Sequence, residues 1–208
     1  MSNATSKLVP ALVAIVLVAS AWFFMRAYMA PGPQPQSATI LPSPMVLPEF
    51  TMLDQDARPF TRASLEDGWN LLFFGFTNCP DVCPTTLQRL TAARGRMLAS
   101  GFAESVLPGI VLISVDPERD TPEVMKSYVA NFGENIVGLT GDMSELEKLT
   151  RQMGIFHAKS SAHQDGYNVD HTSAVLLINP DAQFHALFSN PYTVDDLAHD
   201  LPLILASN

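Results

Sequence analysis

The chain has 208 residues, with 12 Lys and Arg against 21 Asp and Glu, which gives a formal net charge of −9 at pH 7. Binding of nucleic acid needs clustered positive side chains, and no basic patch is present in the sequence, so we expect no nucleic-acid partner. An acidic balance is typical of a soluble domain, and it would also suit a basic protein partner or a cation.

The N-terminal part contains an uncharged apolar run of 18 residues from Leu8 to Met25. About 18 apolar residues are the shortest stretch that crosses a membrane as a helix. Aromatic residues between Trp22 and Tyr28 cluster at its end, where an interfacial belt would lie. A cleavable signal peptide is the alternative, but the small-residue triplet at 19–21 lies inside the run instead of after it.

These features predict the layout of the whole chain. We expect residues 1–7 in the cytoplasm, a transmembrane anchor over residues 8–29, and a proline-rich linker over residues 30–48. Proline excludes a helix interior and a central strand, so the linker should be extended. Residues 49–208 have the composition of one globular domain. The simplest location is a bacterial inner membrane, crossed once, with this domain in the periplasm.

The domain alternates apolar runs with helical patterns. We expect strands at 50–53, 58–60, 70–76, 109–115, 136–139, 155–160, 171–178 and 183–188, and helices at 84–100, 121–133, 143–153 and 193–205. Strands that alternate with helices and end in a hairpin and a last helix predict an α/β sandwich around a mixed sheet. In such folds ligands gather at the carboxyl ends of the strands.

The only two cysteines of the chain, Cys79 and Cys83, lie between the expected strand at 70–76 and the expected helix at 84–100. The free N–H groups and the dipole at a helix start favour thiolate over thiol. Two thiolates four residues apart can form a disulfide bond or bind a soft metal ion such as copper. In an oxidising periplasm the disulfide forms unless a metal or a reductant prevents it.

A metal site would need a third ligand, and His171 is the leading candidate. It opens the expected strand at 171–178, although its position alone supports a ligand and an ordinary surface histidine about equally. The other histidines are more typical of solvated surface: His157, His163, His185 and His199. The loop at 114–122 carries Asp116, for which loop bracing is favoured over a polar wall beside the metal.

Four strings of this sequence carry a resemblance to a known family. They are GFTNCPDVCP at 75–84, SVDPERDT at 114–121, VGLTG at 137–141 and VDHT at 169–172. In this order and spacing the chain resembles the Sco/SenC family from about Glu49 to its end. The resemblance implies a thioredoxin-like fold and one copper ion per chain, Cu+ or Cu2+, bound by Cys79, Cys83 and His171. It places Asp116 at a family position associated with copper handling, as a possible accessory residue.

The resemblance also implies a function. A membrane-anchored metallochaperone would receive copper from an upstream donor and help to assemble the CuA centre in subunit II of cytochrome c oxidase. This interpretation makes the protein primarily a carrier, with room for an accessory thiol–disulfide reductase activity beside copper delivery.

The alternative is a thiol–disulfide oxidoreductase that uses Cys79 and Cys83 as a redox-active pair on the oxidase subunit or on another envelope protein. Three residues separate these cysteines, whereas the familiar redox motif has two, which counts against the enzyme. A peroxidase with a single reactive cysteine fits the paired arrangement poorly.

Overall fold

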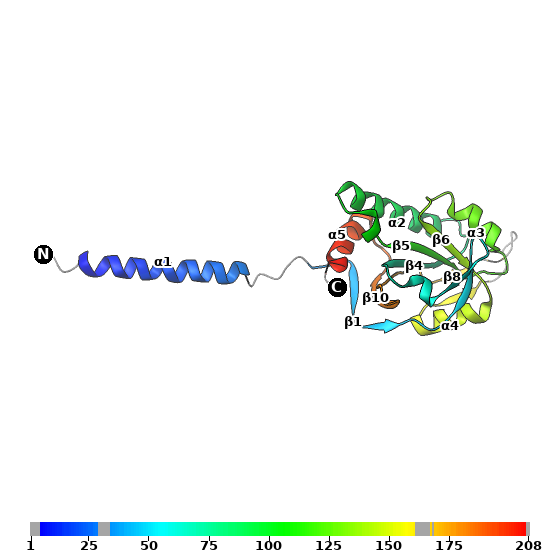
Figure 1. The fold of residues 1–208 in the computed structure, drawn as a ribbon, viewed down its shortest axis with the longest axis horizontal. Helices are drawn as coiled ribbons and strands as arrows, with labels where there is room; N and C mark the ends of the chain where they lie inside the picture. The colour runs from blue at the N-terminus through cyan, green and yellow to red at the C-terminus, as the bar shows by residue number, and fades with distance from the viewer. Residues whose placement is uncertain (1–4, 29–33, 161–166, 168, 207–208) are drawn as a thin grey trace. The chain divides into compact units, whose positions relative to one another are not determined.

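The computed structural model describes residues 5–28, 34–160, 167 and 169–206, with no side-chain description for 5–11 and 27. The chain forms two compact units, residues 1–34 and 35–208, and each is considered by itself (Figure 1). The first contains helix α1, Thr5–Tyr28, whose apolar side chains are exposed from Leu12 to Met25. Among the described residues no helix combines the length and the apolarity needed to cross a membrane, so the expected transmembrane helix is not confirmed.

The second unit is built on a mixed sheet, to which the described residues contribute eight strands. In spatial order these are β1 Ala38–Val46, β10 Gln183–Phe188, β9 Val175–Ile178, β4 Asn70–Gly75, β5 Gly109–Ser114, β6 Ile136–Thr140, β2 Thr51–Asp54 and β3 Pro59–Thr61. Strands β4, β5 and β6 pair in parallel, and the other neighbours pair antiparallel.

Helices cover both faces of this sheet, with α2 and α5 on one side and α4 on the other (Figure 1). The helices are α2 Val82–Ala99, α3 Pro122–Val129, α4 Met143–Met153 and α5 Val194–Leu205, with short 3-10 turns η1 Arg62–Leu65 and η2 Glu104–Val106. Strands β4, β5 and β9 are buried on both faces, which explains their continuous apolar sequences. The fold is therefore the expected thioredoxin-like α/β arrangement around a mixed sheet.

Part of the segment predicted to be an extended linker forms a strand of the main sheet. Residues 38–46 form the edge strand β1, and the compact domain begins at Pro35 instead of at Glu49. Pairing between β1 and β10 is irregular between Ile40 and Met45, the stretch that contains the strand's two prolines. An edge strand tolerates proline at such an irregularity because no neighbour requires the missing N–H.

The strand expected at 171–178 is also divided. Its first part belongs to β8, Val169–His171, which pairs antiparallel with β7, His157–Lys159, in a separate two-stranded sheet. Only Val175–Ile178 joins the main sheet, as β9. His171 therefore ends a small hairpin beside the main sheet, and it does not open a central strand.

Candidate metal centre

Both cysteines lie where β4 gives way to α2. The turn after β4 is closed by a hydrogen bond of 3.3 Å from the Cys79 amide to the carbonyl oxygen of Phe76. Cys83 lies in the first turn of α2, and its amide donates to the Cys79 sulfur at 3.4 Å. Cys79 is half-buried and Cys83 is fully buried. The helix start thus directs a free N–H group at one sulfur, as the sequence predicts.

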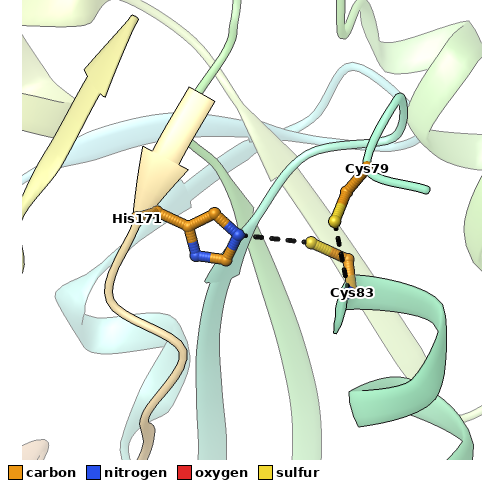
Figure 2. A group of neighbouring side chains, drawn as sticks. All are labelled: Cys79, Cys83 and His171. Carbon is orange, nitrogen blue, oxygen red and sulfur yellow. Dashed lines mark hydrogen bonds between the residues drawn. The ribbon is translucent and has the colours of Figure 1, made fainter. Parts of the chain in front are cut away.

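The imidazole of His171 approaches these sulfurs from the β7–β8 hairpin (Figure 2). Its Nε2 lies 3.5 Å from the Cys83 sulfur, and its Nδ1 lies 3.2 Å from the carbonyl oxygen of Thr172. A carbonyl can only accept, so Nδ1 carries the hydrogen and Nε2 presents its lone pair to the thiols. Metal-binding histidines are usually oriented in this way, with the second ring nitrogen donating to the protein.

Two aromatic rings hold the imidazole in place. The ring of His171 meets Phe73 and Phe76 nearly edge-on, at centroid distances of 5.9 and 5.8 Å. Both phenylalanines are buried, in and just after β4. The histidine therefore rests on the same strand that leads to the cysteines.

The three donor atoms of Cys79, Cys83 and His171 all lie within 4.8 Å of one another. Two metal–sulfur bonds of about 2.3 Å span nearly this distance, so one ion can reach all three donors after a small adjustment. Two sulfurs and one imidazole nitrogen form a donor set that suits soft copper. Within the described ranges no other group of three or more His, Cys, Asp or Glu residues has such a geometry.

The two thiols have opposite electrostatic environments. The hydrogen bond from Cys83 outweighs burial and lowers the pKa of Cys79 to about 4. The same bond to Cys79, together with burial, raises the pKa of Cys83. Near neutral pH the pair therefore holds one thiolate, at Cys79, and one proton. Binding of a metal by both sulfurs would release that proton.

A pocket of about 250 Å³ lies beside the site. Its walls combine apolar side chains with the exposed carboxylates of Asp81 and Asp170. The proposed ligands Cys79 and His171 also line it. The other lining residues are Phe76, Pro80, Val82, Val169 and Ser173. The site is thus reached from solvent on one side and closed by the core on the other.

Asp116 is fully buried just after β5 and lies outside the group that could hold a metal. Its carboxylate pairs with the guanidinium of Arg119 and accepts a hydrogen bond of 2.7 Å from the hydroxyl of Tyr167. These contacts fit the loop-bracing interpretation. The sequence did not single out Arg119 or Tyr167 as residues of the site, because their contacts join segments some fifty residues apart. The only local sign of a role for Arg119 was its place in the charged string at 116–120.

Of the histidines that the structure describes, His157, His185 and His199 lie outside the group of three donors. His157 pairs with His171 across the hairpin and is half-buried, which lowers its pKa. His185 is also half-buried, and its ring packs edge-on against Trp69 at a centroid distance of 5.2 Å. The prediction that His157 and His185 are exposed is therefore wrong. His199 is exposed, as predicted, and its Nδ1 lies 2.8 Å from the buried carboxylate of Asp200. His163 lies outside the described residues.

Comparison with known proteins gives consistent results. The profile of the family described as SCO1/SenC matches residues 39–206. The mitochondrial SCO2 homolog of Bos taurus is 34% identical over 195 residues, which are 93% of this chain and 72% of the bovine protein.

Solved structures show the same similarity. Arabidopsis thaliana ScoI with copper bound is 31% identical with a TM-score of 0.70, over 77% of this chain and 96% of that chain. BsSco, described as a member of the Sco family of cytochrome c oxidase assembly proteins with a disulfide switch, is 26% identical with a TM-score of 0.62. The match covers 82% of this chain and 99% of that one.

Proposed function

The chain belongs to the SCO1/SenC family, and from this premise we propose that it is a copper metallochaperone. It binds one copper ion, Cu+ or Cu2+, through the sulfurs of Cys79 and Cys83 and the Nε2 atom of His171. The observation that carries this proposal is the convergence of three soft donors within 4.8 Å from two separate segments of the chain.

The geometry suits a site that both holds and releases copper. Two thiolates and an imidazole form a set that soft copper accepts without a fourth protein ligand. A structural zinc site, in contrast, usually closes with four protein ligands. The half-exposed sulfur of Cys79 at the pocket leaves an incoming thiolate or imidazole a route to the ion. The fully buried Cys83 keeps the other side of the ion away from solvent.

The destination we propose is the CuA centre in subunit II of cytochrome c oxidase, loaded while its own ligands are still empty. The description of the similar BsSco protein as a cytochrome c oxidase assembly factor supports this assignment. A separate donor protein would supply the copper. Asp116 contributes to copper handling through the loop that it braces and not as a ligand.

The location we propose is a bacterial inner membrane, with residues 35–208 in the periplasm and residues 8–29 as the anchor. The exposed apolar side chains of α1 between Leu12 and Met25 support an attachment to lipid.

The first prediction tests the three-ligand site. In His171→Ala, the reduced protein should bind copper at least about 100-fold more weakly than the wild type, because even the loss of an outer partner of a ligand costs about 10- to 100-fold. A competition titration of each reduced protein with a Cu+ chelator measures the affinity and the stoichiometry. His185→Ala is the matched control, because His185 packs on Trp69 away from the thiols.

Equal copper affinity in His171→Ala and the wild type would contradict the three-ligand site. Cys79→Ser and Cys83→Ser should each abolish tight binding, and retention of one copper per chain in either variant would contradict the proposal as well.

A second candidate function is supported by the state of the cysteine pair. Cys79 is half-exposed with a pKa lowered to about 4, and its partner Cys83 is buried behind it. A thiolate in front of a second thiol is the arrangement of a dithiol reductant, which attacks a disulfide bond and then forms its own. The protein would in this case reduce the cysteines of subunit II.

Transfer experiments separate the two functions. Copper-loaded protein mixed with the reduced, metal-free CuA domain should produce the optical spectrum of CuA if the protein is a metallochaperone. Metal-free reduced protein mixed with the oxidised CuA domain should restore its thiols, counted by alkylation and mass, if it is an oxidoreductase. Thiol restoration without copper movement would favour the second candidate.

A further inference from the structure

The β7–β8 hairpin, which carries His171, is attached to the domain by side chains. In the described part of the chain, β7 and β8 pair only with each other, and neither joins the main sheet. At its base, the Thr172 amide donates to the Phe156 carbonyl at 2.9 Å and the Phe156 amide donates to the Thr172 hydroxyl at 3.0 Å. These bonds close the hairpin on itself, so its position over the thiols depends on other contacts.

Arg119 makes several of those contacts from the loop after β5, where Glu118 also pairs with Lys159 of β7 at 2.6 Å. Its Nη1 donates to the carbonyl oxygen of Tyr167 at 3.0 Å, and its guanidinium lies 3.9 Å from the centroid of the Tyr167 ring. Tyr167 precedes His171 by four residues, just before β8 begins. Arginine thus holds both the backbone and the ring of this residue, with a planar, forked geometry that an ammonium group lacks.

The other end of this contact is a buried carboxylate. Asp116, which is fully buried, pairs with the Nε atom of Arg119 and accepts the hydroxyl of Tyr167 at 2.7 Å. The amide of Asp116 is itself bound to the Ser114 hydroxyl at 3.0 Å. Asp116, Arg119 and Tyr167 therefore form a closed set of contacts, here called the hairpin clamp, which joins the end of β5 to the start of β8.

A second route runs from the clamp to the imidazole. The guanidinium of Arg119 also lies 5.9 Å from the ring centroid of Phe76, and Phe76 meets the ring of His171 edge-on. Arg119 thus contacts two aromatic rings near His171. Tyr167 precedes the histidine in the chain, and Phe76 packs against its imidazole ring. It contacts none of the three donor atoms.

We infer that Arg119 is a positioning residue for copper binding: through Tyr167 and Phe76 it holds the hairpin so that the imidazole of His171 reaches the two thiols. This inference deepens the proposed function and rests on it for its copper readout. The clamp lets the third ligand sit on a separate hairpin while keeping it close to its binding position before the ion arrives. Such preorganisation raises affinity because less ordering is required on binding.

The test compares Arg119→Lys with a matched control, Arg151→Lys. Both replace arginine by lysine and keep the charge, but Arg151 forms only an exposed ion pair with Glu147 on α4. Arg119→Lys should bind copper about 10- to 100-fold more weakly than the wild type, the range expected for the loss of an outer partner of a ligand. Arg151→Lys should bind as the wild type does, and Tyr167→Phe should weaken binding less than Arg119→Lys because it removes only the hydroxyl bond.

A double variant shows whether the effect acts through the histidine. In the His171→Ala background, Arg119→Lys should change copper affinity by no more than about twofold, because its effect requires the imidazole. A full additional loss in that background would overturn the inference, since Arg119 would then act on the fold in general. Unchanged affinity in the single variant Arg119→Lys would overturn it as well.

A metal-free measurement keeps the inference separate from the proposed function. Hydrogen exchange of the metal-free protein should be faster at the amides of β7 and β8 in Arg119→Lys than in the wild type, with β4 and β5 unchanged. Unchanged exchange in the hairpin would contradict the clamp even if copper binds. If the wild type binds no copper, the proposed function fails, and the exchange measurement still decides whether Arg119 holds the hairpin.

Discussion

At the scale of single residues, the candidate site depends on how closely the end of β4 approaches the start of α2. The position of Gly75 shows this: a Cβ atom added there would lie 2.9 Å from the sulfur of Cys83 and 2.9 Å from a ring carbon of Phe73. Carbon atoms do not approach other groups so closely without displacing them. Glycine is therefore required at this position for space, and the space is occupied by a proposed ligand and by the ring that supports His171.

This close approach leads to a prediction for Gly75→Ala. The added methyl group should displace the Cys83 sulfur or the Phe73 ring, lowering copper affinity about tenfold and the free energy of unfolding by about 1–3 kcal/mol. Chelator competition and urea unfolding measure the two effects. Gly95→Ala is the control, because a Cβ there meets nothing within 4 Å and alanine favours a helix. Wild-type copper affinity in Gly75→Ala would contradict the steric argument.

At the scale of secondary-structure elements, α5 holds the start of β1 through one buried carboxylate. Asp200, on α5, accepts hydrogen bonds from the backbone N–H groups of Gln36, Ser37 and Ala38 at 2.8–2.9 Å. It also accepts the Ser37 hydroxyl and lies beside the His199 ring. Burial alone would raise the pKa of Asp200, but these hydrogen bonds, first that of His199, outweigh it and lower the pKa to about 2.

The lowered pKa predicts how stability depends on pH. The folded-state pKa of Asp200 lies below its ordinary value of 3.8, so its stabilisation is complete well above 3.8 and is lost as the pH falls toward 2. Asp200→Asn should therefore lose roughly 2 kcal/mol at pH 7, and the difference from the wild type should shrink between pH 4 and pH 2. Urea unfolding at several pH values measures this difference.

The control for this prediction is Asp181→Asn, because the side chain of Asp181 is exposed in the turn before β10. It should match the wild type at every pH. A stability difference for Asp200→Asn that stays constant down to pH 2 would show that the carboxylate charge is not the cause.

At the scale of the whole molecule, the proposed copper site and the proposed membrane anchor lie in different units of the chain. Residues 35–208 form a compact unit with the main sheet, the core and all three proposed ligands. The exposed apolar side chains of α1 belong to the other unit, residues 1–34. Binding of copper and attachment to a membrane should therefore be separable by truncation.

Truncation tests this separation directly. A chain that starts at Pro35 should remain soluble and bind one copper with the affinity of the full chain, whereas the full chain should sediment with membranes. Fractionation by ultracentrifugation, followed by chelator competition on each protein, measures both properties. A full chain found only in the soluble fraction would contradict the anchor, and a truncated chain that binds copper much more weakly would contradict the independence of the two units.

The sequence by itself was sufficient wherever the cause is local. Continuous apolar runs predict the buried strands β4 and β5, because a strand covered on both faces must be apolar throughout. The cysteine pair is local as well, since four residues across a helix start bring the Cys83 amide within 3.4 Å of the Cys79 sulfur. These features allow the fold class and the two cysteine ligands to be predicted from the residues alone, and the family resemblance adds His171 as the third proposed ligand.

Only the tertiary structure decided the features that join distant segments. It brought His171 within 3.5 Å of Cys83 across 88 residues, on a separate hairpin instead of on a central strand. It made Arg119 the support of that hairpin, and it turned part of a proline-rich segment into β1, held by Asp200 across more than 160 residues. The reason is physical: periodicity and capping report the neighbours of a residue along the chain, whereas the partner of a side chain is set by how the elements pack.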